Sequence, residues 1–169
     1  MDIQTALKEQ YHAALAMLAD CVEQCPDEIW TSGTHPRTVW RIALHAAFFT
    51  QLYLGQDLDA FQPWTASPEE YRVLWTQEQD VEPYELPETI EPLSREDMRA
   101  YIAFVDSLID DTINHLDLEA AETGIPWYKG MSKLSHEIMN LRHTQGHVGQ
   151  LSELLMAHGI DTRWVAKAK

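Results

Sequence analysis

The chain has few basic residues. Its 169 residues include 12 Lys and Arg against 27 Asp and Glu, which gives a formal net charge of −15 at pH 7. A charge of this sign repels phosphate backbones and anionic lipid surfaces alike. The composition therefore argues against nucleic-acid binding and against a charged membrane as a partner.

Cysteine and long apolar runs are scarce as well. Cys21 and Cys25 are the only cysteines, and they stand four residues apart in one expected helix, where thiols pack more readily than they form a bridge. No run approaches the ~18 uncharged apolar residues of a membrane span, and the first residues do not resemble a secretion signal. We therefore expect reduced core thiols in a cytoplasmic protein.

Several familiar catalytic motifs are also missing. The sequence holds no Gly-x-Ser-x-Gly, no glycine-rich phosphate loop and no His-Glu-x-x-His. Alternating strand patterns are absent too, and helical periodicity takes their place. The length suits one domain, which we expect to cover residues 1–169.

Four segments have the apolar spacing of long amphipathic helices. In chain order they cover residues 2–25, residues 38–54, a segment that opens at Ser94, and a segment from Ser132 to His158. Serine can cap a helix start, and the Gly55 and Gly159 positions are typical helix stops. The pattern predicts an all-α protein built as a four-helix bundle.

The segment between the second and third helices, residues 56–93, is a long connection within this domain. It is rich in proline, with Pro63, Pro68, Pro83, Pro87 and Pro92. We expect one short helix in it, from about Pro68 to Trp75. The connection is long enough to cross the bundle, so an up-down-up-down order of helices is not required.

His143 and His147 are the most informative residues of the last helix. Four residues make about one helical turn, so the two imidazoles can point at one common atom. They belong to a stripe that we expect to face the bundle interior or its rim, next to an apolar arc. The stripe comprises His136, Asn140, His143, His147, Leu151, Leu154 and His158, and the arc comprises Leu134, Ile138, Leu141, Val148 and Leu155.

His45 is a candidate third ligand on the second expected helix, where it shares an apolar face with Phe49. A buried imidazole without a partner costs about 1–3 kcal/mol, so it needs a hydrogen bond, a water or a metal. If the two helices are neighbours, three imidazoles meet around one ion and leave positions open for water or substrate. Two alternatives stay open, a satisfied core histidine and a histidine pair that arises by chance.

Three further residues are candidates to orient the ligands, because a ligating imidazole normally gives its second N–H to an acceptor. They are Asn140, His136 and Gln150, although an exposed His136 is the reading that we favour and Gln150 faces away from the apolar arc. The remaining histidines, His12, His35, His115 and His158, are expected to be solvated. Most aromatic residues should be core, and those of the two long connections could cover the metal pocket.

Two segments resemble a known family. The run Asn140–Leu151 is similar to the last helix of the DinB-like superfamily, also called YfiT-like metal-dependent hydrolases, and Trp40–Phe49 is similar to its aromatic-rich second helix. The resemblance implies a four-helix bundle with long crossover connections, often a homodimer, with His45, His143 and His147 as the metal triad. Family members with known activity include transferases and isomerases that use thiols such as bacillithiol or mycothiol.

Taken together, these patterns and the resemblance lead to two functional hypotheses. The first is a metal-dependent hydrolase or low-molecular-weight-thiol transferase that acts on a small electrophilic substrate, with one divalent ion, zinc or nickel before iron or cobalt. The second is a non-catalytic homodimer with a structural or regulatory metal and a role in stress. It is motivated by the lack of a general base, because no Asp or Glu lies on the histidine stripe.

Overall fold

The computed structural model describes residues 2–75 and 85–169, and over these ranges all regular structure is helical. The expected all-α class is thus confirmed. The long helices are α1 (Ile3–Gln24), α3 (Val39–Leu54), α4 (Arg95–His115) and α5 (Lys133–Met156). The shorter elements are α2 (Asp27–Trp30) and two 3₁₀ helices, η1 (Leu58–Ala60) and η2 (Glu69–Leu74).

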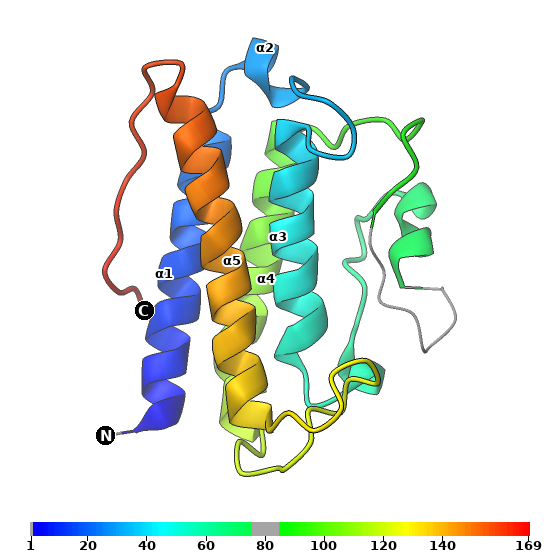
Figure 1. The fold of residues 1–169 in the computed structure, drawn as a ribbon, viewed down its shortest axis with the longest axis vertical. Coiled ribbons are helices and arrows are strands. Elements are labelled where there is room, and N and C mark those ends of the chain that lie inside the picture. The colour runs from blue at the N-terminus through cyan, green and yellow to red at the C-terminus, as the bar shows by residue number, and fades with distance from the viewer. Residues whose placement is uncertain (1, 76–84) are drawn as a thin grey trace.

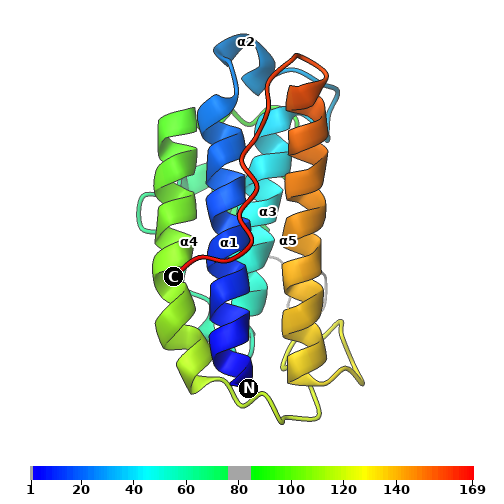
Figure 2. The ribbon, with the colours of Figure 1, turned by 90° about the vertical axis from the view of Figure 1, so that its left-hand side faces the viewer.

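The long helices lie side by side along one axis (Figure 1). α1 packs against α4 and α5, and α3 packs against the same two helices, so the order around the axis is α1, α4, α3, α5. The chain runs in opposite directions in α1 and α3, keeps the direction of α3 in α4, and reverses in α5 (Figures 1 and 2). Only the connection between α3 and α4 therefore crosses the length of the molecule; its residues 76–84, with Pro83, lie outside the described residues.

Helix boundaries follow the capping residues of the sequence. The Ser94 side chain accepts from the backbone N–H of Asp97 at the start of α4, and the Ser132 side chain accepts from that of Ser135 at the start of α5. These bonds satisfy backbone donors that a helix start leaves free. Two details differ from expectation: α2 was not predicted, and the short segment after Pro68 is a 3₁₀ helix.

The rotation of α5 about its own axis differs from the expected one. Ile138, expected in the apolar arc, is 55% exposed, whereas His136 and Asn140 are fully buried. The interior face of α5 consists of polar residues of its first half, followed by apolar ones: Lys133, His136, Glu137, Asn140 and Thr144, then Val148, Leu151 and Leu155. Water does not reach this face, so its polar atoms depend on partners inside the protein. Among the described residues, both ring nitrogens of His136 and Oδ1 of Asn140 have no hydrogen bond.

A buried ion pair is one result of this rotation. Lys133 and Glu137, one turn apart on α5, are both fully buried, with 3.2 Å between Nζ and Oε1. Lys133 also donates to the carbonyl oxygen of Gly55, and the Tyr11 hydroxyl donates to Glu137 Oε2 at 2.6 Å. The network ties α5 to α1 and to the end of α3.

The remaining core is apolar and includes both thiols. Cys21 and Cys25 are free and buried, as expected. His12 is a correction, because it was expected to be solvated but is buried between α1 and α4, with Nδ1 2.7 Å from Asp106 Oδ1. No helix in the described part of the chain combines the length and apolarity needed to cross a membrane.

After α5 the chain turns back and runs along α1 to its end (Figure 2). The backbone N–H of Ala168 donates to the carbonyl oxygen of Glu9 at 3.2 Å, and Lys167 pairs with the Glu9 carboxylate at 3.4 Å. The tail therefore covers α1 on the side of the molecule away from the connection between α3 and α4.

Candidate metal centre

Three histidines from two helices meet between α3 and α5. His45 of α3 and His143 and His147 of α5 form the cluster, and each is half-buried. The Nε2 atom of His143 lies 3.2 Å from that of His45 and 3.0 Å from that of His147. The structure thus brings together all three residues that the sequence singled out.

The separation of these nitrogens is close to what a metal ion requires. Ligands about 2.05 Å from a tetrahedral ion lie about 3.3 Å from one another. Within the described residues, these histidines are the group of His, Cys, Asp and Glu whose ligand atoms all fall within 4.8 Å of one another. Because all three atoms are Nε2, the opposite ring nitrogens remain for hydrogen bonds that orient the rings.

Burial favours the neutral form of His143 and His147. Desolvation and the neighbouring His147 lower the pKa of His143 to about 4. The pKa of His147 is also lowered, first by burial and further by the positive charge of Arg37, although its contact with Gln150 opposes the shift. Neutral imidazole is the form that binds a metal, so these ligands are ready for one at neutral pH.

Of the residues expected to orient the ligands, Gln150 makes the contact. Its Oε1 atom lies 2.8 Å from Nδ1 of His147, which leaves Nε2 of that ring free to face the other histidines. From the sequence, Gln150 is the weaker candidate to orient a ligand, because it faces away from the apolar arc. Gln150 is exposed, but it lies three residues after His147 on the same helix, so its amide reaches back to the ring.

The other two candidates lie deeper in the core and do not contact the histidine cluster through any hydrogen bond of the described residues. The Asn140 amide donates to the carbonyl oxygen of Thr50 at 3.1 Å. His136, favoured as exposed, is fully buried and packs against the rings of Tyr53 and Tyr128 at 5.2 and 5.4 Å. That expectation for His136 was wrong.

A narrow pocket opens beside His45. Its described lining residues are Arg41, Leu44, His45, Phe48, Phe49, Leu74, Glu85 and Leu86. Phe49 packs on both His45 and His143, with ring centroids 4.4 and 5.7 Å apart. Trp64, Trp75, Trp127 and Tyr128 are not among the lining residues, so the expected aromatic cover is replaced by Leu74 and the segment that follows residue 84.

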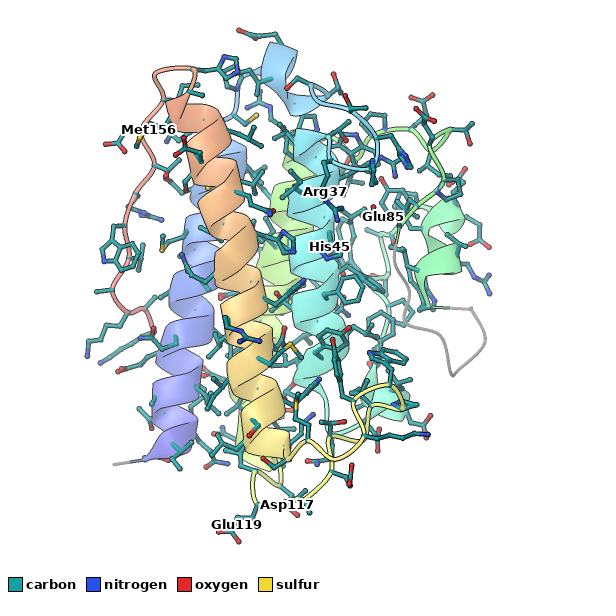
Figure 3. The ribbon with its side chains drawn as sticks, viewed as in Figure 1. Arg37, His45, Glu85, Asp117, Glu119 and Met156 are labelled. Carbon is teal, nitrogen blue, oxygen red and sulfur yellow. The ribbon has the colours of Figure 1, made fainter. Side chains whose placement is uncertain are left out.

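The segment Glu85–Leu86–Pro87, here called the strap, is held against the start of α3. The buried Arg41 guanidinium donates to the carbonyl oxygens of Leu86 and Pro87, both at 2.6 Å. Arg37 pairs with the Glu85 carboxylate at 2.6 Å. Figure 3 shows Arg37 and Glu85 near His45 on α3.

Sequence reasoning did not find Arg37, Arg41 or Glu85. Arg41 precedes His45 by four residues on α3, a spacing that places the two on one side of the helix and was visible in the sequence. Arg37 lies just before the helix, where this spacing does not apply. Glu85 has no such signal, because it lies in a proline-rich connection without periodicity. Its proximity to His45 arises from the path of the connection alone.

Comparison with family models, with curated proteins and with solved structures gives no match to this chain. The chemistry of the site must therefore be argued from its own geometry.

Proposed function

We propose that this protein binds one divalent metal ion through Nε2 of His45, His143 and His147 and uses it for catalysis on a small electrophilic substrate. The reaction is hydrolysis or the transfer of a low-molecular-weight thiol. The observation that carries the proposal is the convergence of three Nε2 atoms, with 3.0 and 3.2 Å between neighbours, from helices almost a hundred residues apart.

The donor set supports zinc or nickel, with iron or cobalt as further candidates. Three neutral imidazoles occupy one side of an ion and leave at least one position open for a ligand from solution. A bound ion of this kind supplies Lewis acidity, which favours deprotonation of a water or thiol and polarises a carbonyl. The chain itself holds the rings in place, through Gln150 at His147 and through Phe49 at His45 and His143.

A catalytic ion fits the packing better than a purely structural one. α3 and α5 already pack along their length, and the ligand-bearing faces include the buried residues Phe49, Leu52 and Val148. A structural zinc site usually replaces such a core in a small domain and has four protein ligands. We therefore expect the fold to persist without the ion.

The wider framework of the proposal rests on the family resemblance. We propose that the four long helices constitute a DinB-like four-helix bundle and that the protein acts as a homodimer. Free, buried Cys21 and Cys25 are consistent with a reducing, cytoplasmic location. Size-exclusion chromatography with light scattering tests the dimer.

Elemental analysis tests the metal site directly. The full chain is purified without a histidine tag and loaded beside a control protein with a known zinc site. We expect about one equivalent of divalent metal per chain, and less than about a tenth of an equivalent would overturn the proposal. His143→Ala should lose the metal, whereas His115→Ala, at an exposed position on α4, should keep it.

Activity of the same variants separates a catalytic from a structural ion. A panel of activated esters, and of electrophiles with added thiols, is assayed with the wild type and with H143A. Retained helicity with lost turnover supports the catalytic role. Loss of folding in H143A, with no reaction in the wild type, supports the structural alternative.

A further inference from the structure

The strap brings a carboxylate to the pocket beside His45. The histidine stripe on α5 contains no carboxylate. Glu85 and His45 line the same pocket, and the Glu85 side chain is 14% exposed. Its position is fixed from two sides. Arg37 pairs with its Oε1 atom, and Arg41 holds the two following carbonyl oxygens at 2.6 Å.

Glu85 lies outside the histidine cluster and is not a fourth member of it. Its carboxylate does not join the three histidines in the group whose ligand atoms lie within 4.8 Å of one another. Glu85 and His45 line the same pocket, so a molecule in this pocket would meet both residues. A carboxylate in this position can exchange a proton with that molecule.

The burial of Arg41 shows that specific hydrogen bonds hold the strap in place. A guanidinium that is 4% exposed must have acceptors, and it finds two of them in the strap backbone. Leu86, which lies between Glu85 and Pro87, is itself buried in the core. Glu85 is thereby held at the pocket by Arg41 of α3, the helix that carries His45, and by Arg37 just before this helix.

We propose that Glu85 is the proton acceptor of the reaction at the three-histidine site and that Arg37 is its positioning residue. The nucleophile is a small molecule with an O–H or S–H bond. This bond breaks and its proton forms an O–H bond with a carboxylate oxygen of Glu85, while the electron pair of the broken bond forms the new bond to the electrophilic atom. The bond from that atom to the leaving group breaks, its electron pair departs with the leaving group, and Glu85 returns the proton to it. This assignment rests on the proposed metal-dependent function.

The ion pair with Arg37 is compatible with this role. A carboxylate has about four acceptor sites on its two oxygens, so one contact with a guanidinium leaves room for a second donor. Among the described residues, Arg41 and His45 are the other charged or titratable groups that line the pocket. His35 lies beside the strap, with Nε2 3.4 Å from the carbonyl oxygen of Leu86, and His147 of α5 is close enough to feel the charge of Arg37.

The test uses Co²⁺ alone as the probe, bound to the full chain and followed by its visible absorption spectrum during a pH titration. Glu85→Gln removes a negative charge near the ion. We expect the inflection of the spectrum to move to lower pH by about one unit, a tenfold change in proton affinity. Arg37→Met removes a positive charge and should move the inflection to higher pH.

A matched control variant and the opposite directions of the two pH shifts distinguish an action of Glu85 at the ion from an ion pair that only holds the strap. Glu88→Gln, at an exposed position just after the strap, should leave the inflection in place. If the Glu85–Arg37 pair lay too far from the ion to act at the site, neither E85Q nor R37M would move the inflection. Equal shifts, or shifts below about 0.2 unit in both variants, overturn the assignment while stoichiometric cobalt binding keeps the proposed function intact.

Two further outcomes are decisive. Loss of cobalt from E85Q alone would make Glu85 a ligand and overturn its role as the proton acceptor, and failure of the wild type to bind cobalt would overturn both proposals. If E85Q does not fold, Glu85→Asp carries the test, because it withdraws the carboxylate by one methylene and should give a smaller shift of the same sign. Once a reaction is identified, E85Q should lower kcat about 100-fold or more with little change in KM.

Discussion

Nδ1 of His147 lies 2.8 Å from Oε1 of Gln150, three residues later on α5. The amide oxygen can only accept, so the contact places the imidazole hydrogen on Nδ1 and leaves the Nε2 lone pair directed at the histidine cluster. One polar side chain on the exposed surface of the helix therefore selects the tautomer of a ligand. In the metal site proposed above, Gln150 would thereby orient His147 for the ion.

Replacement of Gln150 should weaken metal binding without removing it. Loss of a hydrogen bond that orients a ligating histidine typically reduces affinity by about 10–100-fold, so Gln150→Ala should fall in this range for zinc. Competition with a chromophoric chelator measures the affinity. Glu153→Ala, an exposed substitution one turn further along α5, is the control; equal affinities of both variants would remove Gln150 from the site.

The metal-free protein should lose stability as the pH falls from about 6.5 towards 4. Burial and His147 lower the pKa of His143 to about 4, below the ~6.5 of an unfolded histidine. Within this window the unfolded chain binds more protons than the folded one, so acid favours unfolding. Urea unfolding midpoints at several pH values measure the effect.

A variant isolates the part of this acid sensitivity that belongs to His143. His143→Gln cannot take up the proton, so its stability relative to the wild type should improve steadily as the pH is lowered through the window. Saturating zinc should move the acid transition of the wild type to lower pH, because the ion competes with protons for the ligands. Parallel curves for wild type and H143Q would contradict the assignment.

The buried pair of Lys133 and Glu137 should be costly to break and less costly to replace. Lys133→Met leaves an unpaired buried carboxylate and Glu137→Leu leaves an unpaired ammonium, so each should lower the free energy of unfolding by about 3–5 kcal/mol. The double variant K133M/E137L should cost less than the sum of the two, because no unpaired charge remains. Denaturant unfolding measures all three.

An exposed pair in the same protein serves as the control for that experiment. Lys167 and Glu9 lie 3.4 Å apart at the surface, where ion pairs contribute little. Lys167→Met should change the free energy of unfolding by no more than about 0.5 kcal/mol. Additive effects at Lys133 and Glu137 would show that the two charges do not depend on each other.

Both cysteines should be unreactive in the folded protein. Burial raises the pKa of the Cys25 thiol to about 11 and also raises that of Cys21, so little thiolate forms at pH 8. A chromogenic disulfide reagent should therefore detect almost no thiol in the native protein and both thiols in concentrated guanidinium. Fast reaction of the native protein at either position would contradict the buried placement.

The pair His143 and His147 could be predicted from the sequence because its geometry is local. Residues four apart on a helix lie one above the other whatever the helix packs against. The caps at Ser94 and Ser132 are local in the same sense, and both helices begin where these serines predict. The prediction that His45 joins this pair needed one further assumption, that α3 and α5 are neighbours. The structure confirms that they are.

The exposure of Ile138 and burial of His136 could not be predicted in this way. Periodicity identifies the residues that share a face, but two adjacent faces of α5 were both candidates for the interior. The choice depends on partners from elsewhere in the chain, Tyr11 for Glu137, Thr50 for Asn140 and Tyr53 for His136. With these partners present, the polar face could be buried and the apolar one left partly outside.

The sequence by itself determined the helices, their ends and the spacing of two ligands, because hydrogen bonds between residues three or four apart set these features. Only the tertiary structure decided that His45 completes the cluster and that Glu85 lines the pocket beside His45. Glu85 is the extreme case. It lies forty residues from His45 in a segment without periodicity, and the long-range bonds from Arg37 and Arg41 fix its position.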